Sequence, residues 1–220
     1  MEKDKQDLAA YYAQRAAHYD EIYQRPERQE QQQALLAQLT QLTAGQNVLE
    51  LACGTGYWTQ AMAQQAKSVL ALDINPEMLA VATQRQLDPS VVRFQQADIC
   101  ALPDAIAAEK FSVCVAAFWW SHVKRAEQDA FIQQLRAKVG SACQLVLIDN
   151  CYVEGDSTPI ARTDSDGNTY QFRKQVDGST VEIVKNFPSD SNLRKRFASL
   201  ARDVRVHRAQ HFWLLTCRLK

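Results

Sequence analysis

The sequence predicts an α/β fold in which helices cover both faces of a mostly parallel sheet. After Gly45, short apolar runs alternate with stretches that have the character of helices. The runs are apolar along their whole length, as strands buried on both faces are. At 220 residues the chain is long enough for one such domain and too short for two ordinary enzyme domains. We therefore expect residues 1–220 to form a single domain.

The alternating part contains five expected strands and four expected helices. The strands are Asn47–Leu51, Ser68–Leu72, Val91–Gln95, Phe111–Ala117 and Cys143–Asp149. The helices are Arg28–Leu42, Tyr57–Gln65, Pro76–Gln86 and Lys124–Val139. In the first and last of these helices, large apolar side chains form a stripe along one face, which is the pattern of a helix packed on a sheet.

The C-terminal third departs from this alternation. Asp-Gly turn dipeptides at 166–167 and 177–178 flank two runs whose residues alternate in polarity. This pattern predicts an antiparallel hairpin over Asn168–Asn186, present as an insertion spanning residues 166–187.

A short helix and two more strands are expected after the hairpin. Either Ser189 or Ser191 would serve as the N-cap of the helix. The runs Asp203–Arg208 and His211–Leu219 are separated by a tight turn and would close the sheet as an antiparallel pair. The chain shows no internal repeat and no linker.

Composition excludes or disfavours several classes of protein. Lys plus Arg and Asp plus Glu both number 25, so the basic excess of a protein that grips nucleic acid is missing. No apolar run approaches the roughly 20 residues needed to cross a bilayer, and the N-terminal residues lack the apolar stretch of a secretory signal. The six cysteines form no CxxC pair, which favours reduced thiols over a disulfide frame or a metal site. We therefore expect a cytoplasmic protein that binds no metal and no membrane.

The segment Val48–Thr59, which reads VLELACGTGYWT, is the expected ligand-binding loop. It runs from a buried strand into the start of a helix, and ligands of open α/β sheets bind at such strand ends. Gly54 and Gly56 allow a sharp turn and let a ligand approach the backbone amides. The helix N-terminus adds unpaired N–H groups.

Two carboxylates narrow the choice of ligand. Glu50 ends the first strand and Asp73 ends the next, where a carboxylate suits both hydroxyls of a ribose. An adenosine-containing ligand is indicated, which leaves dinucleotides and S-adenosylmethionine (SAM) open. The third glycine of a dinucleotide fingerprint is replaced by Thr59, and Glu50 would repel a pyrophosphate. A ligand with an ammonium and a sulfonium would attract Glu50, so the electrostatics favour SAM.

Four ordered segments resemble the motifs of class I SAM-dependent methyltransferases. ELACGTGYWT (50–59) resembles the first motif with Ala52 in place of its first glycine, and ALDINPEML (71–79) the second. QADICALP (96–103) and FSVCVAAFWWSHV (111–123) resemble the third motif and the fourth strand with its loop. The resemblance implies a Rossmann-like three-layer sandwich with a seven-stranded, mostly parallel sheet and an antiparallel last strand.

The resemblance also implies which residues contact the cofactor. Asp73 would bind the ribose, Asp98 would accept a hydrogen bond from the adenine amino group, and Ile99 would supply a backbone amide. The full set of cofactor residues implied within these motifs is Glu50, Ala52, Cys53, Gly54, Gly56, Trp58, Asp73, Ile74, Met78, Asp98, Ile99, Ala116 and Phe118.

The N-terminal segment YYAQRAAHYDEIY (11–23) resembles the lid of small-molecule methyltransferases, among them the quinone-biosynthesis C-methyltransferases. Residues 1–27 are accordingly expected to form a lid, with Tyr11 and Tyr19 against the cofactor and Tyr12 beside them. The alternative is a helix that merely packs its aromatic side chains on the domain.

Trp119, Trp120 and His122 follow the fourth strand and are the expected acceptor-side residues. Because Trp119 and Trp120 are consecutive, one of them should wall the acceptor pocket, and core packing is the alternative. His122 is the candidate general base, and the alternative is a ring bonded to the backbone.

The expected reaction is an in-line displacement at the SAM methyl by a small-molecule acceptor. The methylated atom (N, O, S or C) and a homodimeric state are left open. Two alternatives are a methyltransferase of protein or RNA that uses the hairpin as a docking surface, and a non-catalytic SAM-binding protein. A nicotinamide dehydrogenase is a more distant one.

Overall fold

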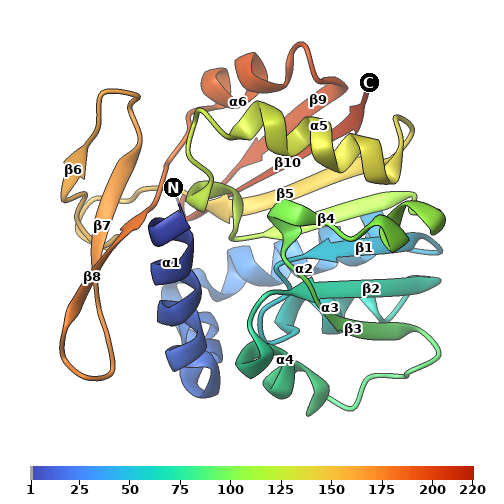
Figure 1. The fold of residues 1–220 in the computed structure, drawn as a ribbon, viewed down its shortest axis with the longest axis horizontal. Helices are drawn as coiled ribbons and strands as arrows, with labels where there is room; N and C mark the ends of the chain where they lie inside the picture. The colour runs from blue at the N-terminus through green and yellow to red at the C-terminus, as the bar shows by residue number, and fades with distance from the viewer. Residues whose placement is uncertain (1) are drawn as a thin grey trace.

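The computed structural model describes residues 2–220 and contains a seven-stranded sheet in the order β3-β2-β1-β4-β5-β10-β9 (Figure 1). β1 to β5 pair in parallel, and β10 runs antiparallel to both of its neighbours. This confirms the expected mostly parallel sheet with an antiparallel last strand. The strands are β1 (Asn47–Leu51), β2 (Ser68–Asp73), β3 (Val92–Gln96), β4 (Val113–Ala117), β5 (Gln144–Asn150), β9 (Ala201–Arg208) and β10 (Phe212–Leu219).

Helices cover the two faces of the sheet, as the all-apolar strands require. The helices after the N-terminal segment are α2 (Gln29–Thr43), α3 (Tyr57–Met62), α4 (Pro76–Thr83), α5 (Gln128–Val139) and α6 (Asp190–Phe197). α5 and α6 pack on one face, where Leu49 and Leu51 of β1 point, and α2 and α3 pack on the other, where Val48 points. Because strand side chains alternate between the faces, the inner strands β1, β2, β4, β5 and β10 contribute to both cores. The edge strands contribute to one core each, β9 on the α5 and α6 face and β3 on the other.

The boundaries of three helices differ from the sequence prediction by three residues or more. α3 ends at Met62 instead of Gln65, α4 ends at Thr83 instead of Gln86, and α5 begins at Gln128 instead of Lys124. Residues 124–127 form a turn, in which the Arg125 N–H donates to the Asn168 side chain of the insertion at 2.8 Å. A tertiary contact therefore replaces the first helical turn.

The N-terminal segment lies across the carboxyl ends of the parallel strands. It consists of α1 (Glu2–Arg15) and a 3₁₀ segment, Ala16–Gln24. α1 contacts β8 and α4, so it lies between the insertion and the main sheet (Figure 1).

The insertion is a three-stranded antiparallel sheet beside α1 (Figure 1). β7 (Thr169–Lys174) and β8 (Thr180–Val184) form the expected hairpin, and β6 (Arg162–Thr163) adds a short strand that the sequence analysis did not anticipate. Ser189 caps α6, since its hydroxyl accepts from the Asn192 N–H. Among residues 2–220, no helix is both long and apolar enough to cross a membrane.

Candidate active site

The loop after β1 has the backbone conformation that the glycine pattern predicts. Ala52, Gly54 and Gly56 all have positive φ, at 53°, 55° and 74°. A Cβ on Gly56 would come within 3.1 Å of Ala82 Cβ, so only glycine fits this close approach to α4. The loop therefore turns sharply at the end of β1 and leaves its amides facing the strand ends.

Asp73 fastens this loop to the end of β2. Its carboxylate accepts the backbone N–H of Gly54 at 2.8 Å and that of Asn75 at 2.9 Å. Burial raises the pKa of Asp73, and these backbone hydrogen bonds partly offset the rise. Asp98 lies at the end of the third strand and accepts the Cys100 N–H at 2.8 Å. Both carboxylates border the same cavity.

This first cavity has a volume of about 440 Å³ and runs along the carboxyl ends of β1, β2 and β4 under α1. It brings together most of the residues predicted from the sequence. Those that line it are Tyr19, Ala52, Gly54, Asp73, Ile74, Met78, Asp98, Ile99, Phe118, Trp119 and His122. Those that do not line it are Tyr11, Glu50, Cys53, Gly56, Trp58, Ala116 and Trp120.

Further lining residues lie outside the four motifs that predicted the cofactor site. α1 contributes Leu8 and Tyr12, and α5 contributes Phe131 and Gln134. The tyrosine pair at 11–12 was a partial signal, because it fell in the expected lid. The α5 residues carried only an apolar stripe, which core packing explains equally well.

Glu50 lies behind the glycine loop with only 1% of its surface exposed. The Thr59 hydroxyl of α3 donates to its carboxylate at 2.5 Å. Burial raises the pKa of Glu50 to about 8, although the Thr59 hydrogen bond lowers it in part. No cationic side chain among residues 4–220 pairs with Glu50, so the acid is mostly protonated at neutral pH, and a ligand that carries positive charge would favour its ionised form.

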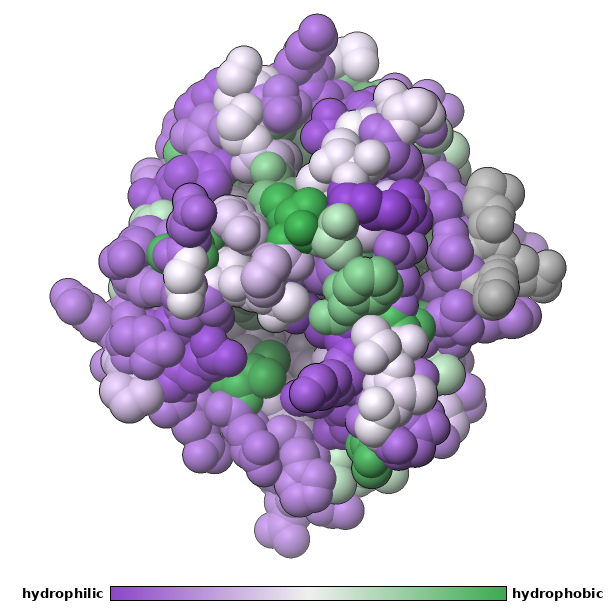
Figure 2. Space-filling view, turned by 90° about the vertical axis from the view of Figure 1, so that its left-hand side faces the viewer, coloured by the Kyte–Doolittle hydropathy of each residue, from purple (hydrophilic) through white to green (hydrophobic). Residues whose placement is uncertain are grey.

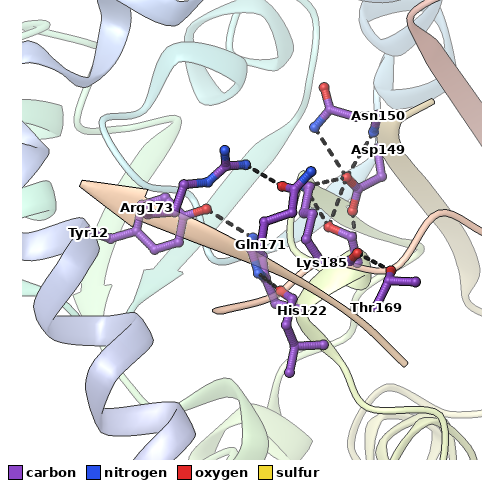
Figure 3. A network of polar contacts seen from close by, with 10 residues as sticks. Tyr12, His122, Asp149, Asn150, Thr169, Gln171, Arg173 and Lys185 are labelled. Carbon is purple, nitrogen blue, oxygen red and sulfur yellow. Dashed lines mark hydrogen bonds and ion pairs between the residues drawn. The ribbon is translucent and has the colours of Figure 1, made fainter. Parts of the chain in front are cut away.

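His122 is held at both ring nitrogens (Figure 3). Its Nδ1 lies 2.7 Å from the Val184 carbonyl oxygen, which can only accept, so Nδ1 carries the proton. Nε2 then accepts from the Tyr12 hydroxyl at 2.9 Å. Burial, and secondarily the Lys185 charge, lower the pKa of His122 to about 3. The ring is neutral, and it links α1 to β8.

The two consecutive tryptophans point in different directions. Trp119 borders the first cavity and packs on Phe131 with ring centroids 4.5 Å apart. Trp120 is 1% exposed and packs against Phe197 of α6 in the core. The structure thus brings only Trp119 to the cavity, and Trp120 has the core position that was the alternative interpretation.

A second cavity of about 240 Å³ adjoins the first beneath the N-terminal segment. The two cavities share three aromatic residues, Tyr12, Tyr19 and Phe118. Phe118 has a positive φ of 60°, a strained conformation, and its ring packs against those of Tyr23, Trp58 and Phe212. The second cavity is also lined by Arg15, Arg25, Arg28, Arg173, Lys185 and Asp156.

Lys185 is anchored at the floor of this region (Figure 3). Its ammonium donates to the Ser121 hydroxyl at 2.6 Å and to the Asp149 carboxylate at 3.0 Å. Burial would raise the pKa of Asp149, but the charge of Lys185 and the hydrogen bonds from two backbone N–H groups outweigh it and hold this pKa low. The ion pair therefore ties β8 to the end of β5.

Comparisons with known proteins identify the family of this chain. Residues 48–140 match the family model described as a methyltransferase domain. The structure of a DhpI–SAH complex superposes with a TM-score of 0.78 at 30% identity, covering 100% of this chain and 98% of that one. The structure of a DhpI–SAM–HEP complex superposes with a TM-score of 0.77 at 31% identity, covering 98% of this chain and 97% of that one.

One curated relative is the ubiquinone biosynthesis O-methyltransferase of Pseudomonas fluorescens (strain SBW25). It is 36% identical over 81 residues, which are 36% of this chain and 34% of that enzyme. The chain thus matches about a third of the length of this relative.

The parallel sheet, the glycine loop and the acidic residues at the strand ends define a class I, Rossmann-like nucleotide-binding enzyme fold. The chain belongs to the SAM-dependent methyltransferase family, since its likeness to DhpI extends over nearly the whole of both chains.

Proposed function

We propose that this chain transfers the methyl group of SAM to a small-molecule acceptor. The observation that carries the proposal is the pair of adjoining cavities. The first has the carboxylates and glycine loop of a nucleoside site, and the second is a separate space reached past Tyr12, Tyr19 and Phe118. Enzymes of this kind need one cavity for each of the two reactants.

The first cavity supplies groups suited to each part of SAM. Asp73 would bind the ribose hydroxyls, and Asp98 with Ile99 would bind the adenine, between Ile74 and Met78. A cationic ligand in the cavity would favour the ionised form of Glu50, which lies buried behind the loop. When bound, SAM supplies an electrophilic methyl group on a sulfonium.

The protein's own contribution to the reaction would be alignment and the exclusion of water. Tyr12 and Tyr19 border both cavities, and α1 covers them. Holding two reactants in line is worth effective molarities of order 10⁵ M or more. Since Nε2 of His122 is engaged by Tyr12, we propose that His122 acts by positioning the Tyr12 hydroxyl at the junction of the cavities.

A small acceptor agrees better with the surface than a macromolecular one. The side of the molecule that bears the insertion is mostly hydrophilic, with apolar residues interspersed (Figure 2). Phe172 and Val176 of the hairpin are 57% and 76% exposed, but the second cavity lies beneath α1 and is only about 240 Å³. A space of this size suits a small molecule or a single extended side chain.

The proposal is tested with SAM labelled in its methyl group. The protein is incubated with a protein-free metabolite filtrate in one arm and with a protein and RNA fraction in the other. We expect label to enter the filtrate and the Asp73→Asn variant to transfer none. The proposal would be refuted if label were found only in the macromolecular fraction. It would also be refuted if the protein formed no more S-adenosylhomocysteine than heat-denatured protein does.

A further inference from the structure

We infer that the second cavity binds an anionic oxygen group, a carboxylate or a phosphoryl group, of the acceptor. The identification of the bound molecule as the acceptor rests on the proposed function. The evidence for an anion site is the set of charges that line the second cavity, the way these charges are paired, and the position of this cavity beside the first one.

Among the charged side chains that line the second cavity, cations outnumber acids. Within the part of the chain that the structure describes, five cations and one carboxylate border it. Arg25 and Arg28 both pair with that carboxylate, Asp156, at 3.3 and 2.5 Å. Hydrogen bonding from Arg28 holds the pKa of Asp156 low, so this acid is ionised and already engaged. Asp156 therefore does not balance the charges of the other cations in the lining, Arg15, Arg173 and Lys185.

Arg173 of β7 has only neutral partners among residues 4–220. Its guanidinium donates to the Thr158 hydroxyl and to the Gln171 side-chain oxygen, the latter at 2.6 Å. Gln171 is in turn bonded to the Thr158 carbonyl, so the Arg173 side chain is fixed in place. Arginine cannot lose its proton, and a half-buried guanidinium without a counter-ion is unfavourable. An anion in the cavity would supply that counter-ion.

Arg15 is the second cation without an acidic partner among the described residues. It is the last residue of α1, and its guanidinium lies over the Tyr11 ring, 5.5 Å from the centroid. It reaches the cavity from the lid, whereas Arg173 reaches it from the insertion. An anion bound between the two would hold the lid and the insertion together.

Lys185 adds a partly engaged donor. It is 5% exposed, and Asp149 balances its charge. An ammonium has three N–H donors, and Ser121 and Asp149 take two of them. The third is left for an anion, with the lysine held rigidly by its other bonds (Figure 3).

The position of the cavity makes it suitable for an acceptor. Tyr12, Tyr19 and Phe118 border both cavities, so an anion on Arg173 lies on the far side of these rings from the cofactor site. Two uncompensated guanidinium groups would repel a protonated amine and attract an anion. The cavity therefore selects the acceptor by charge.

The test is calorimetry on protein saturated with S-adenosylhomocysteine at constant ionic strength. Inorganic phosphate is titrated in one arm and acetate in the other, and binding of either supports the site and names its preferred anion. Arg173→Gln and Arg15→Gln should each weaken this binding by about 10-fold or more, because charge-assisted hydrogen bonds are lost. S-Adenosylhomocysteine affinity should not change.

Lys174→Gln is the matched control, because it removes one positive charge from the next residue of β7, which is exposed and lies outside the cavity lining. It should bind both anions as wild type does. The inference is overturned if neither anion binds wild type, or if Arg173→Gln binds as wild type.

The two proposals can fail separately. Phosphate or acetate binding that depends on Arg173, together with no methyl transfer to any small molecule, would refute the proposed function and leave an anion site. Transfer to a neutral or cationic acceptor at an unchanged rate in Arg173→Gln would refute the anion inference and leave the function intact.

Discussion

The two cavities of this protein differ in how they are built. The first is made mainly from short segments that follow consecutive parallel strands, and each segment carries its own sequence motif. The second takes its charged groups from α1, the turn before α2, the loop after β5 and the insertion. Arg15 and Arg173 are far apart in sequence and line the same cavity because α1 packs against β8 of the insertion.

This difference matches the chemistry of the two sites. The first cavity has carboxylates at two strand ends and a buried acid behind its loop, which suits a cationic nucleoside. The second has an excess of arginine, which suits an anion. The first cavity thus depends mainly on the ends of the parallel strands, whereas the second depends on the N-terminal segment, the loop after β5 and the insertion.

The largest effect that would separate the cavities is expected for Asp73→Ala. The loss of the carboxylate that we propose for the ribose, and of two backbone hydrogen bonds, should weaken S-adenosylhomocysteine binding by about 100-fold or more. Phosphate binding in the second cavity should persist. Calorimetry checks both, with the exposed acid Asp104→Ala as control, and undiminished cofactor affinity would remove Asp73 from the ribose.

Glu50→Gln tests the raised pKa of the buried acid behind the glycine loop. Because the folded pKa of Glu50 is raised to about 8, its contribution to stability is full below about pH 4.5 and is lost as the pH rises through 8. The variant should remove this loss, which is a few kcal/mol at about 1.4 kcal/mol per pKa unit. Thermal unfolding of the cofactor-free protein from pH 5 to 9 measures it, and an unchanged pH dependence contradicts the assignment.

Gly56→Ala tests the close approach that shapes the first cavity. The added methyl group meets Ala82 and the backbone has positive φ, so we expect a loss of about 1–3 kcal/mol in unfolding free energy. Gly54→Ala is the matched control, since its φ is also positive but no atom lies within 4 Å of its Cβ. Equal losses in denaturant unfolding would show that contact with Ala82 is unimportant.

The smallest effect is expected for Tyr12→Phe, at the junction of the two cavities. The variant leaves Nε2 of His122 without its donor, which should cost about 1 kcal/mol in unfolding free energy. Both ligands should bind with affinities within a few-fold of wild type. A loss of either ligand comparable with that in Asp73→Ala would make Tyr12 a principal binding residue instead of a positioning one.

Much of the fold was predictable because its strands carry strong local signals. β1 to β5 lie within two residues of the predicted runs, and the hairpin followed from its Asp-Gly turns. β6 was missed because Arg162 and Thr163 are both exposed and form no apolar pattern. α1 was not assigned as a helix because its sequence is polar and has no clear apolar stripe.

The candidate site divides in the same way. The glycine loop, Asp73 and Asp98 were predicted because their chemistry depends on residues next to one another in sequence. Arg173 and Lys185 were not predicted, since alternation in a hairpin does not reveal which side chains turn toward a distant helix. The residues that line the second cavity are brought together by contacts between segments distant in sequence, and no local pattern marks them.

The central claim is that the two cavities bind two different ligands independently. Its most direct measurement is a cross-titration of Asp73→Ala and Arg173→Gln with S-adenosylhomocysteine and with the anion, phosphate or acetate, that binds wild type. The account predicts that Asp73→Ala loses only the nucleoside and that Arg173→Gln loses only the anion. If either variant lost both ligands while remaining folded, or if neither lost one, the division into a cofactor cavity and an anion cavity would be wrong.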